Sequence, residues 1–104
     1  MFDAVSQLAT YRQTIDNLDA ALVYILAERF RCTDEVGLLK AKYELSPVDQ
    51  GREDRQYSRL RKLARDSKVD EGLIESLMKS VIKEVVRRHR QIAAEYTSGR
   101  ISQQ

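Results

Sequence analysis

Apolar residues recur at alternating steps of three and four along the first forty or so residues of the chain. With Arg29 as its one charged member, the run comprises Leu8, Tyr11, Ile15, Leu18, Leu22, Ile25, Arg29, Cys32, Val36, Leu39 and Tyr43. Such a pattern, held over about five heptads, is typical of one long helix with an apolar seam on one side. We expect this helix to end within residues 44–48, where Pro47 interrupts the pattern.

Two shorter helices follow in the pattern. Ser46 is a suitable N-cap, Pro47 suits a first helical position, and Asp49 can reach back to form a capping box, so a second helix is predicted from there to about Asp66. Asp70 is the predicted N-cap of a third helix. Its apolar stripe comprises Leu73, Ile74, Leu77, Met78, Val81, Ile82, Val85 and Ile92. The sequence therefore predicts an all-α fold with three helices in each chain.

The length of the first helix predicts a homodimer. About 38 residues at about 1.5 Å per residue give a helix of about 57 Å, whereas a compact chain of this size has a radius of gyration of only about 13 Å. Two shorter helices cannot cover so long a seam, so a second, antiparallel copy is expected to cover it. We expect an intertwined six-helix homodimer of one helical domain, residues 1–95. Residues 96–104, rich in Ser, Gly and Gln, are expected to form a flexible tail.

The composition argues against several classes of function. The 104 residues are 42% hydrophobic and 33% charged, as in a soluble protein of one domain. A net charge of +2 indicates no surface dedicated to nucleic acid. No stretch resembles a signal peptide or a membrane span, so we expect a cytoplasmic protein. With Cys32 and His89 as the single residues of their types, neither an intrachain disulfide nor a metal site is expected.

Charged and polar residues on apolar faces are the candidates for chemistry. Arg29 lies in the seam of the first helix, where a desolvated guanidinium needs an anionic partner, and Lys40 lies on the same face about three turns later. Arg52 and Glu53 lie on the predicted inward side of the second helix, and His89 lies on the buried stripe of the third. The pattern therefore predicts a polar interior assembled from all three helices.

Each of these residues also has a structural interpretation. A charge on a helical seam can set register by pairing with a carboxylate of the partner helix. Arg52 and Glu53 could form a surface salt bridge, and His89 could be an interior histidine with one backbone hydrogen bond. The basic residues around it, Arg87, Arg88 and Arg90, are interpreted as a solvated helix face.

The combination of these residues resembles the all-helical (type II) class of bacterial chorismate mutases, from about Ala9 to Ile92. The matching segments are residues 11–19 (YRQTIDNLD), 26–29 (LAER), 36–40 (VGLLK), 47–53 (PVDQGRE) and 64–65 (AR). The spacing from Arg12 through Arg29 and Lys40 to Arg52 agrees with that family, which makes the resemblance specific.

The resemblance implies a pocket for a small dicarboxylate, chorismate, which is rearranged to prephenate in aromatic amino-acid biosynthesis. Arg12, Arg29 and Arg52 would hold the carboxylates, because arginine can bind them in a bidentate way. Lys40 would donate to the ether oxygen and to a carboxylate. The acidic residues that would receive the ring hydroxyl or orient neighbouring donors are Asp49 and Glu53. Lys40, Glu53 and His89 would be the catalytic residues. The reaction is intramolecular, so no cofactor and no metal are implied.

One family feature agrees with helix geometry. Arg12 and Arg29 are seventeen residues apart on one helix, or about 25 Å, so they cannot hold the same ten-carbon molecule. In the family each pocket takes this first arginine from the partner subunit, and Arg12 is expected to be donated in that way.

The third helix departs from the family pattern. Where many members carry a small polar residue and, four positions later, a glutamine on the ether oxygen, this chain has Val85 and His89. Val85 can form no polar contact, whereas His89 can donate, more strongly as a cation. We therefore expect turnover to depend on pH between about 5 and 8.

Two alternatives stay open. An isochorismate-pyruvate lyase uses the same kind of cationic pocket in a related helical dimer, and the segment of residues 47–53 with its Asp49 favours the mutase. A helical dimerisation module without catalytic activity is the alternative from another class.

Overall fold

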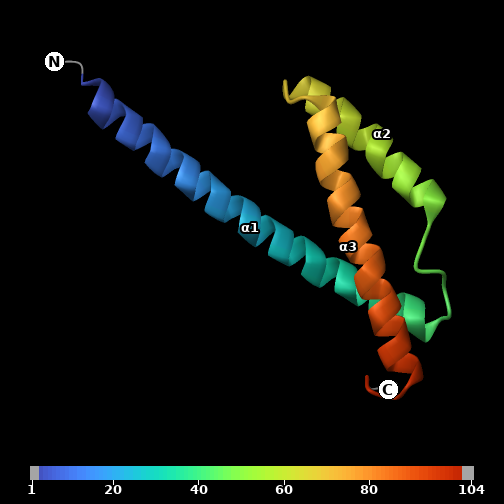
Figure 1. Ribbon diagram of the computed structural model, residues 1–104. Coiled ribbons are helices and arrows are strands. Elements are labelled where there is room, and N and C mark those ends of the chain that lie inside the picture. The colour runs from blue at the N-terminus through green and yellow to red at the C-terminus, as the bar shows by residue number, and fades with distance from the viewer. Residues whose placement is uncertain (1–2, 102–104) are drawn as a thin grey trace. The chain divides into compact units, whose positions relative to one another are not determined.

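The computed structural model describes residues 3–101, which form three helices and no strand. They are α1 (Ala4–Lys42), α2 (Gln50–Asp66) and α3 (Glu71–Thr97), as Figure 1 shows. The prediction of an all-α chain with three helices is confirmed, and α1 is the longest at 39 residues. None of the described helices is both long and apolar enough to cross a membrane.

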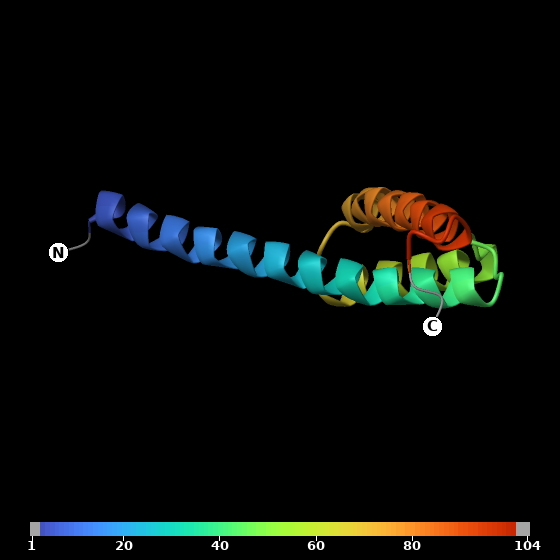
Figure 2. The ribbon, with the colours of Figure 1, turned by 90° about the horizontal axis from the view of Figure 1, so that it is seen from below.

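Helix α1 runs without interruption from Ala4 to Lys42 (Figure 2). The Asp3 carboxylate accepts hydrogen bonds at the N-terminus from the Val5 backbone N–H (3.0 Å) and the Ser6 hydroxyl (2.7 Å). At the other end the Leu45 N–H donates to the Lys40 carbonyl over 2.8 Å, with Glu44 in the left-handed region at φ 56°. The helix therefore ends just before the predicted interruption.

Helix α2 begins later than predicted, because the cap is Asp49 and not Ser46. Asp49 Oδ1 accepts from the Arg52 backbone N–H over 3.0 Å, and the helix starts at Gln50. The Ser46 hydroxyl instead accepts from the Val48 N–H over 3.2 Å within the connecting segment. A carboxylate bonded directly to an otherwise unpaired amide of the first turn is a strong cap, and it defines the start of the helix. The predicted end at Asp66 is confirmed.

Helix α3 begins as predicted. Asp70 is its N-cap, with Oδ2 accepting from the Leu73 N–H over 2.9 Å. The helix continues to Thr97, two residues into the segment expected to be a flexible tail. A turn follows, in which the Arg100 N–H donates to the Glu95 carbonyl (2.9 Å) and Gly99 has a φ of 77°. Residues 102–104 of the expected tail lie outside the described residues.

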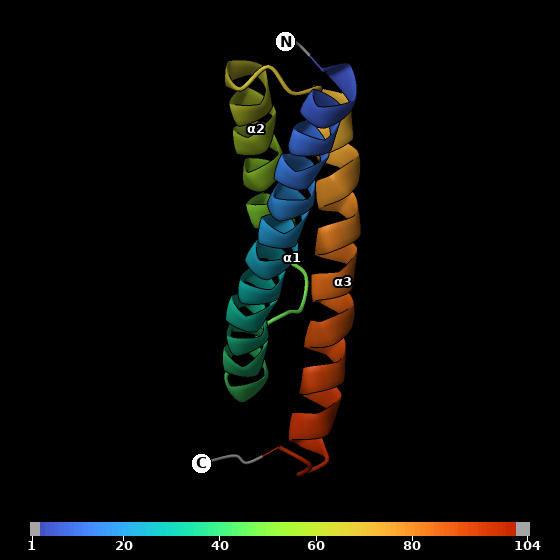
Figure 3. The ribbon, with the colours of Figure 1, turned by 90° about the vertical axis from the view of Figure 1, so that its left-hand side faces the viewer.

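The chain forms two compact units, one up to Cys32 and the other from Thr33 onward. In the second unit α2 and α3 contact each other and run in opposite directions (Figures 1 and 3). Its buried residues come from all three helices and are few. They are Gly37, Ala64, Val81, Ile82 and His89. Val81, Ile82 and His89 belong to the predicted buried stripe of α3.

The first unit is the N-terminal part of α1, and its apolar seam is exposed in a single chain. Leu18 and Ile25 keep 63% and 64% of their surface. The other exposed members are Leu8, Tyr11, Ile15, Leu22 and Cys32. A contiguous exposed apolar stripe on a helix indicates a surface that another molecule covers.

Candidate functional site

The first unit carries two of the predicted arginines. Arg12 is exposed, whereas Arg29 is half-buried. The Arg29 Nη1 atom is shielded from solvent and has no hydrogen-bond partner among the described residues. Leaving a charged donor buried and unpaired is costly, so a built-in anion or an anionic ligand is needed to complete its hydrogen bonding.

In the second unit, Lys40 lies in the last turn of α1 and is half-buried. At the start of α2, the Asp49 carboxylate uses Oδ1 for the helix cap. Arg52 is exposed and Glu53 is half-buried, and neither forms an ion pair with another described residue. The surface salt bridge considered for these two residues is therefore not formed here. Their charges are available to a ligand.

Glu53 lines a cavity of about 680 Å³ together with residues of α3. Its lining includes two apolar and four cationic residues. Besides Glu53 the lining comprises Lys79, Ser80, Ile82, Lys83, Glu84, Val86, Arg87 and Arg90. Of the site residues predicted from sequence, only Glu53 lines this cavity.

The charge of Glu53 also affects a neighbour within α2. Desolvation raises the pKa of the Tyr57 phenol, and the negative charges of Glu53 and of Glu75 raise it further. Glu53 lies one helical turn before Tyr57, so the two side chains share one side of α2.

Val85 and His89 lie on the inner side of α3. Val85 is half-buried, and His89 retains only 4% of its surface. The His89 Nε2 atom lies 2.7 Å from the Thr33 backbone carbonyl of α1. Because a carbonyl can only accept, Nε2 carries the hydrogen and donates. His89 Nδ1 is shielded from solvent and has no partner among the described residues. The backbone hydrogen bond of an interior histidine is thus present, and one ring nitrogen stays unused.

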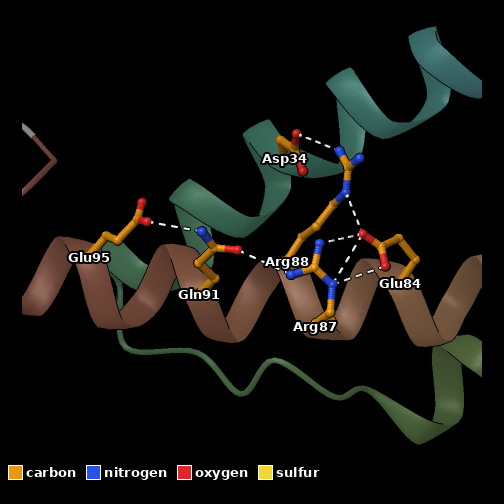
Figure 4. Close-up of polar contacts among 6 residues, drawn as sticks. All are labelled: Asp34, Glu84, Arg87, Arg88, Gln91 and Glu95. Atoms are coloured by element: carbon orange, nitrogen blue, oxygen red, sulfur yellow. Dashed lines mark hydrogen bonds and ion pairs between the residues drawn. The ribbon is translucent and has the colours of Figure 1, made fainter.

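An ion network runs along α3 and reaches Asp34 of α1 (Figure 4). Arg88 donates to Asp34 of α1 over 3.0 Å and to Glu84 over 3.1 Å. Glu84 also accepts from Arg87, and the hydrogen bonds from Arg87 and then Arg88 lower the pKa of Glu84 to about 2. The interpretation of Arg88 as part of a solvated face was wrong, because its guanidinium pairs with two carboxylates and attaches α3 to α1.

The sequence contained part of the signal for this network. Glu84 lies three and four residues before Arg87 and Arg88, a spacing at which helical side chains meet. Asp34 and Arg88 are 54 residues apart, and no local spacing indicates that they pair. Among the described residues, no group of three or more His, Cys, Asp or Glu side chains could hold a metal ion.

Comparison with known proteins agrees with the chemistry of these side chains. The family model described as Chorismate mutase type II matches residues 11–90. The T-protein of Enterobacter agglomerans is 35% identical over 80 residues, which are 77% of this chain and 21% of that protein. The chorismate mutase of Methanocaldococcus jannaschii is 32% identical over 69 residues, or 66% of this chain and 70% of that protein. The chain spans about a fifth of the T-protein. The predicted resemblance is confirmed, and the chain belongs to the chorismate mutase type II family.

Proposed function

We propose that this chain is an isomerase that rearranges chorismate to prephenate, in a pocket completed by a second copy of the chain. The main support is Arg29, whose shielded Nη1 has no partner among the described residues. A substrate carboxylate would supply the missing acceptor through a charge-assisted hydrogen bond. Arg29 also lies within the part of the chain that matches the family.

The reaction needs positioning more than reactive groups. One carbon–oxygen bond breaks while a carbon–carbon bond forms in the same molecule, so no nucleophile or base is required. Arg29 and Arg52 would hold the two carboxylates and keep the enolpyruvyl side chain over the ring. The Lys40 ammonium would donate to the ether oxygen, where negative charge grows in the transition state. Asp49 and Glu53 would orient the ring hydroxyl or the neighbouring donors.

The proposed homodimer follows from α1. Its exposed apolar stripe from Leu8 to Ile25 would pack against the same stripe of an antiparallel copy. Arg12, about 25 Å from Arg29 along the helix, would then serve the partner's pocket. Six helices in two intertwined chains would form the active enzyme. A cytoplasmic location remains a prediction from sequence.

The contribution of α3 is proposed to come from His89, with Val85 as an apolar wall beside it. Since Nε2 is bonded to the Thr33 carbonyl, Nδ1 is the ring nitrogen left for the substrate. A neutral ring would accept at Nδ1, and only the imidazolium would donate there. If His89 donates to the ether oxygen, His89→Ala should lower kcat. Full activity in His89→Ala would assign His89 to packing alone.

The decisive experiment is to incubate the purified protein with chorismate and, separately, with isochorismate, and to identify the products by proton NMR. Prephenate from chorismate is the expected result. Pyruvate formed mainly from isochorismate would show that the activity is that of an isochorismate-pyruvate lyase and not of a mutase. Turnover of neither compound by a folded dimer would favour the helical dimerisation module.

A further inference from the structure

Gly37 of α1 lies against the His89 ring of α3. A Cβ atom built on Gly37 would lie 2.6 Å from His89 Cδ2 and 3.1 Å from His89 Nε2. It would also lie 3.1 Å from Cδ1 of Ile92. Contacts below 3.0 Å essentially do not occur for real Cβ atoms, so any side chain at position 37 requires a neighbour to move.

Burial and a hydrogen bond restrain the His89 ring. Its Nε2 atom donates to the Thr33 carbonyl over 2.7 Å, and only 4% of the residue's surface is exposed. Thr33 lies one helical turn before Gly37, so the carbonyl and the glycine are on the same side of α1. The planar ring therefore lies against the bare backbone of α1 at Gly37. Ile92, whose contact is the end of a flexible side chain, can adjust more easily.

We infer that Gly37 is a positioning residue for the proposed reaction, acting through His89. By leaving room for the ring, Gly37 lets His89 Nε2 donate to the Thr33 carbonyl. That hydrogen bond occupies Nε2 and leaves Nδ1 as the unpaired ring nitrogen. The ion pair between Arg88 and Asp34 joins the residue before His89 in α3 to the residue after Thr33 in α1. Together these contacts hold the last turns of α1 on α3.

The last turns of α1 carry Lys40, three residues after Gly37. A shift of α1 away from α3 would therefore move the Lys40 ammonium and His89 Nδ1 at the same time. Displacements near 1 Å in an active site can lower turnover by about a hundredfold. This inference rests on the proposed mutase function, since it assigns Gly37 a role in the same pocket.

A double-mutant cycle tests the inference. Gly37→Ala is expected to lower kcat for chorismate by about tenfold to a hundredfold, with a much smaller change in KM because the arginines stay in place. In a His89→Ala background the clash partner is absent, so the same Gly37→Ala change should alter kcat by less than about twofold. All rates are compared at a temperature where circular dichroism shows every variant folded. An equal loss in both backgrounds overturns the inference.

The chain offers a matched control in Gly72. Its Cβ would meet only the Asp70 carboxylate, at 3.1 Å, at the other end of α3. Gly72→Ala is the same substitution in a helix and should leave kcat unchanged. A loss of kcat in Gly72→Ala comparable with that in Gly37→Ala would make the effect general to helical glycines and would overturn the inference.

Thermal unfolding of the same four cycle proteins needs no turnover. Gly37→Ala should lower Tm in the presence of His89 and leave Tm nearly unchanged in the His89→Ala background. Additive Tm changes would show that the two residues do not interact and would overturn the inference. Failure of the unaltered protein to convert chorismate would refute the proposed function instead, and the two failures are thereby distinguished.

Discussion

The two parts of α1 carry the same heptad pattern in different surroundings. In the first unit, Leu18 and Ile25 of the stripe remain exposed in a single chain. From Thr33 onward, the helix is bonded to α3 through the Thr33 carbonyl and Asp34, and Gly37 is buried. The comparison shows that a heptad pattern predicts a helix with an apolar side but does not say which chain covers that side.

A charge placed in the apolar stripe should disrupt the proposed dimer contact of the first part of α1 and leave the packing of the second part on α3 intact. Leu18→Asp places a carboxylate in the proposed dimer seam, where burial of an unpaired charge is strongly unfavourable. We expect a monomer by light scattering, and chorismate turnover reduced by at least about a hundredfold because each pocket loses the partner's Arg12. Tyr24→Asp, on the opposite side of the helix and 74% exposed, is the matched control. An active Leu18→Asp monomer would contradict the shared pocket.

Mixed dimers sharpen the comparison by separating the two arginines. Arg12→Ala and Arg29→Ala subunits are each expected to be inactive alone. After subunit exchange, half of the dimers contain both variants, and each mixed dimer has one intact pocket. About a quarter of the original activity should therefore return. No recovery of activity, after mass spectrometry has verified subunit exchange, would rule out a shared pocket.

Removing the cap of α3 tests the second unit alone. Asp70 Oδ2 bonds to the Leu73 N–H, and Asp70→Ala should lower the free energy of unfolding by about 1 kcal/mol. Urea unfolding at constant protein concentration measures the change. The dimer should persist and kcat should be unaltered, since Asp70 lies outside the predicted site. A change in association state would mean that the two parts do not respond separately.

The smallest effect is expected from acid titration of the network on α3. Arg87 and Arg88 lower the pKa of Glu84 from 4.5 to about 2, so its contribution to stability is present above pH 4.5 and is lost as the pH falls towards 2. The stability difference between the unaltered protein and Glu84→Gln should therefore be constant from pH 7 to 5 and shrink below pH 4.5. Screening by solvent keeps the difference small. A difference that grew on acidification would reverse the assigned sign.

Local signals allowed much of the fold to be predicted. The heptad steps predicted α1 to within a few residues at each end, and Asp70 was identified as a cap because its carboxylate satisfies an amide only three residues away. The start of α2 was misplaced because Ser46 and Asp49 are both good caps. Which of them binds a first-turn amide depends on the path of the connecting segment.

The candidate site was predictable in composition but not in contacts. Arg29 and His89 were found because a polar residue on an apolar helix face is conspicuous in the sequence. Their surroundings could not be predicted, because the hydrogen bond from His89 to the Thr33 carbonyl joins residues that are 56 positions apart. Gly37 was not singled out either, since a helical glycine gives no sign of what lies against it until the neighbouring helix is placed.

The sequence by itself determined three helices, the apolar side of each, and the charged residues of a family-specific pattern, because these depend on spacing along one chain. Only the tertiary structure decided that His89 donates to the Thr33 carbonyl, that Gly37 makes room for it, and that Asp34 pairs with Arg88. Such contacts depend on how two helices meet, and many different pairs of side chains satisfy the same local pattern equally well.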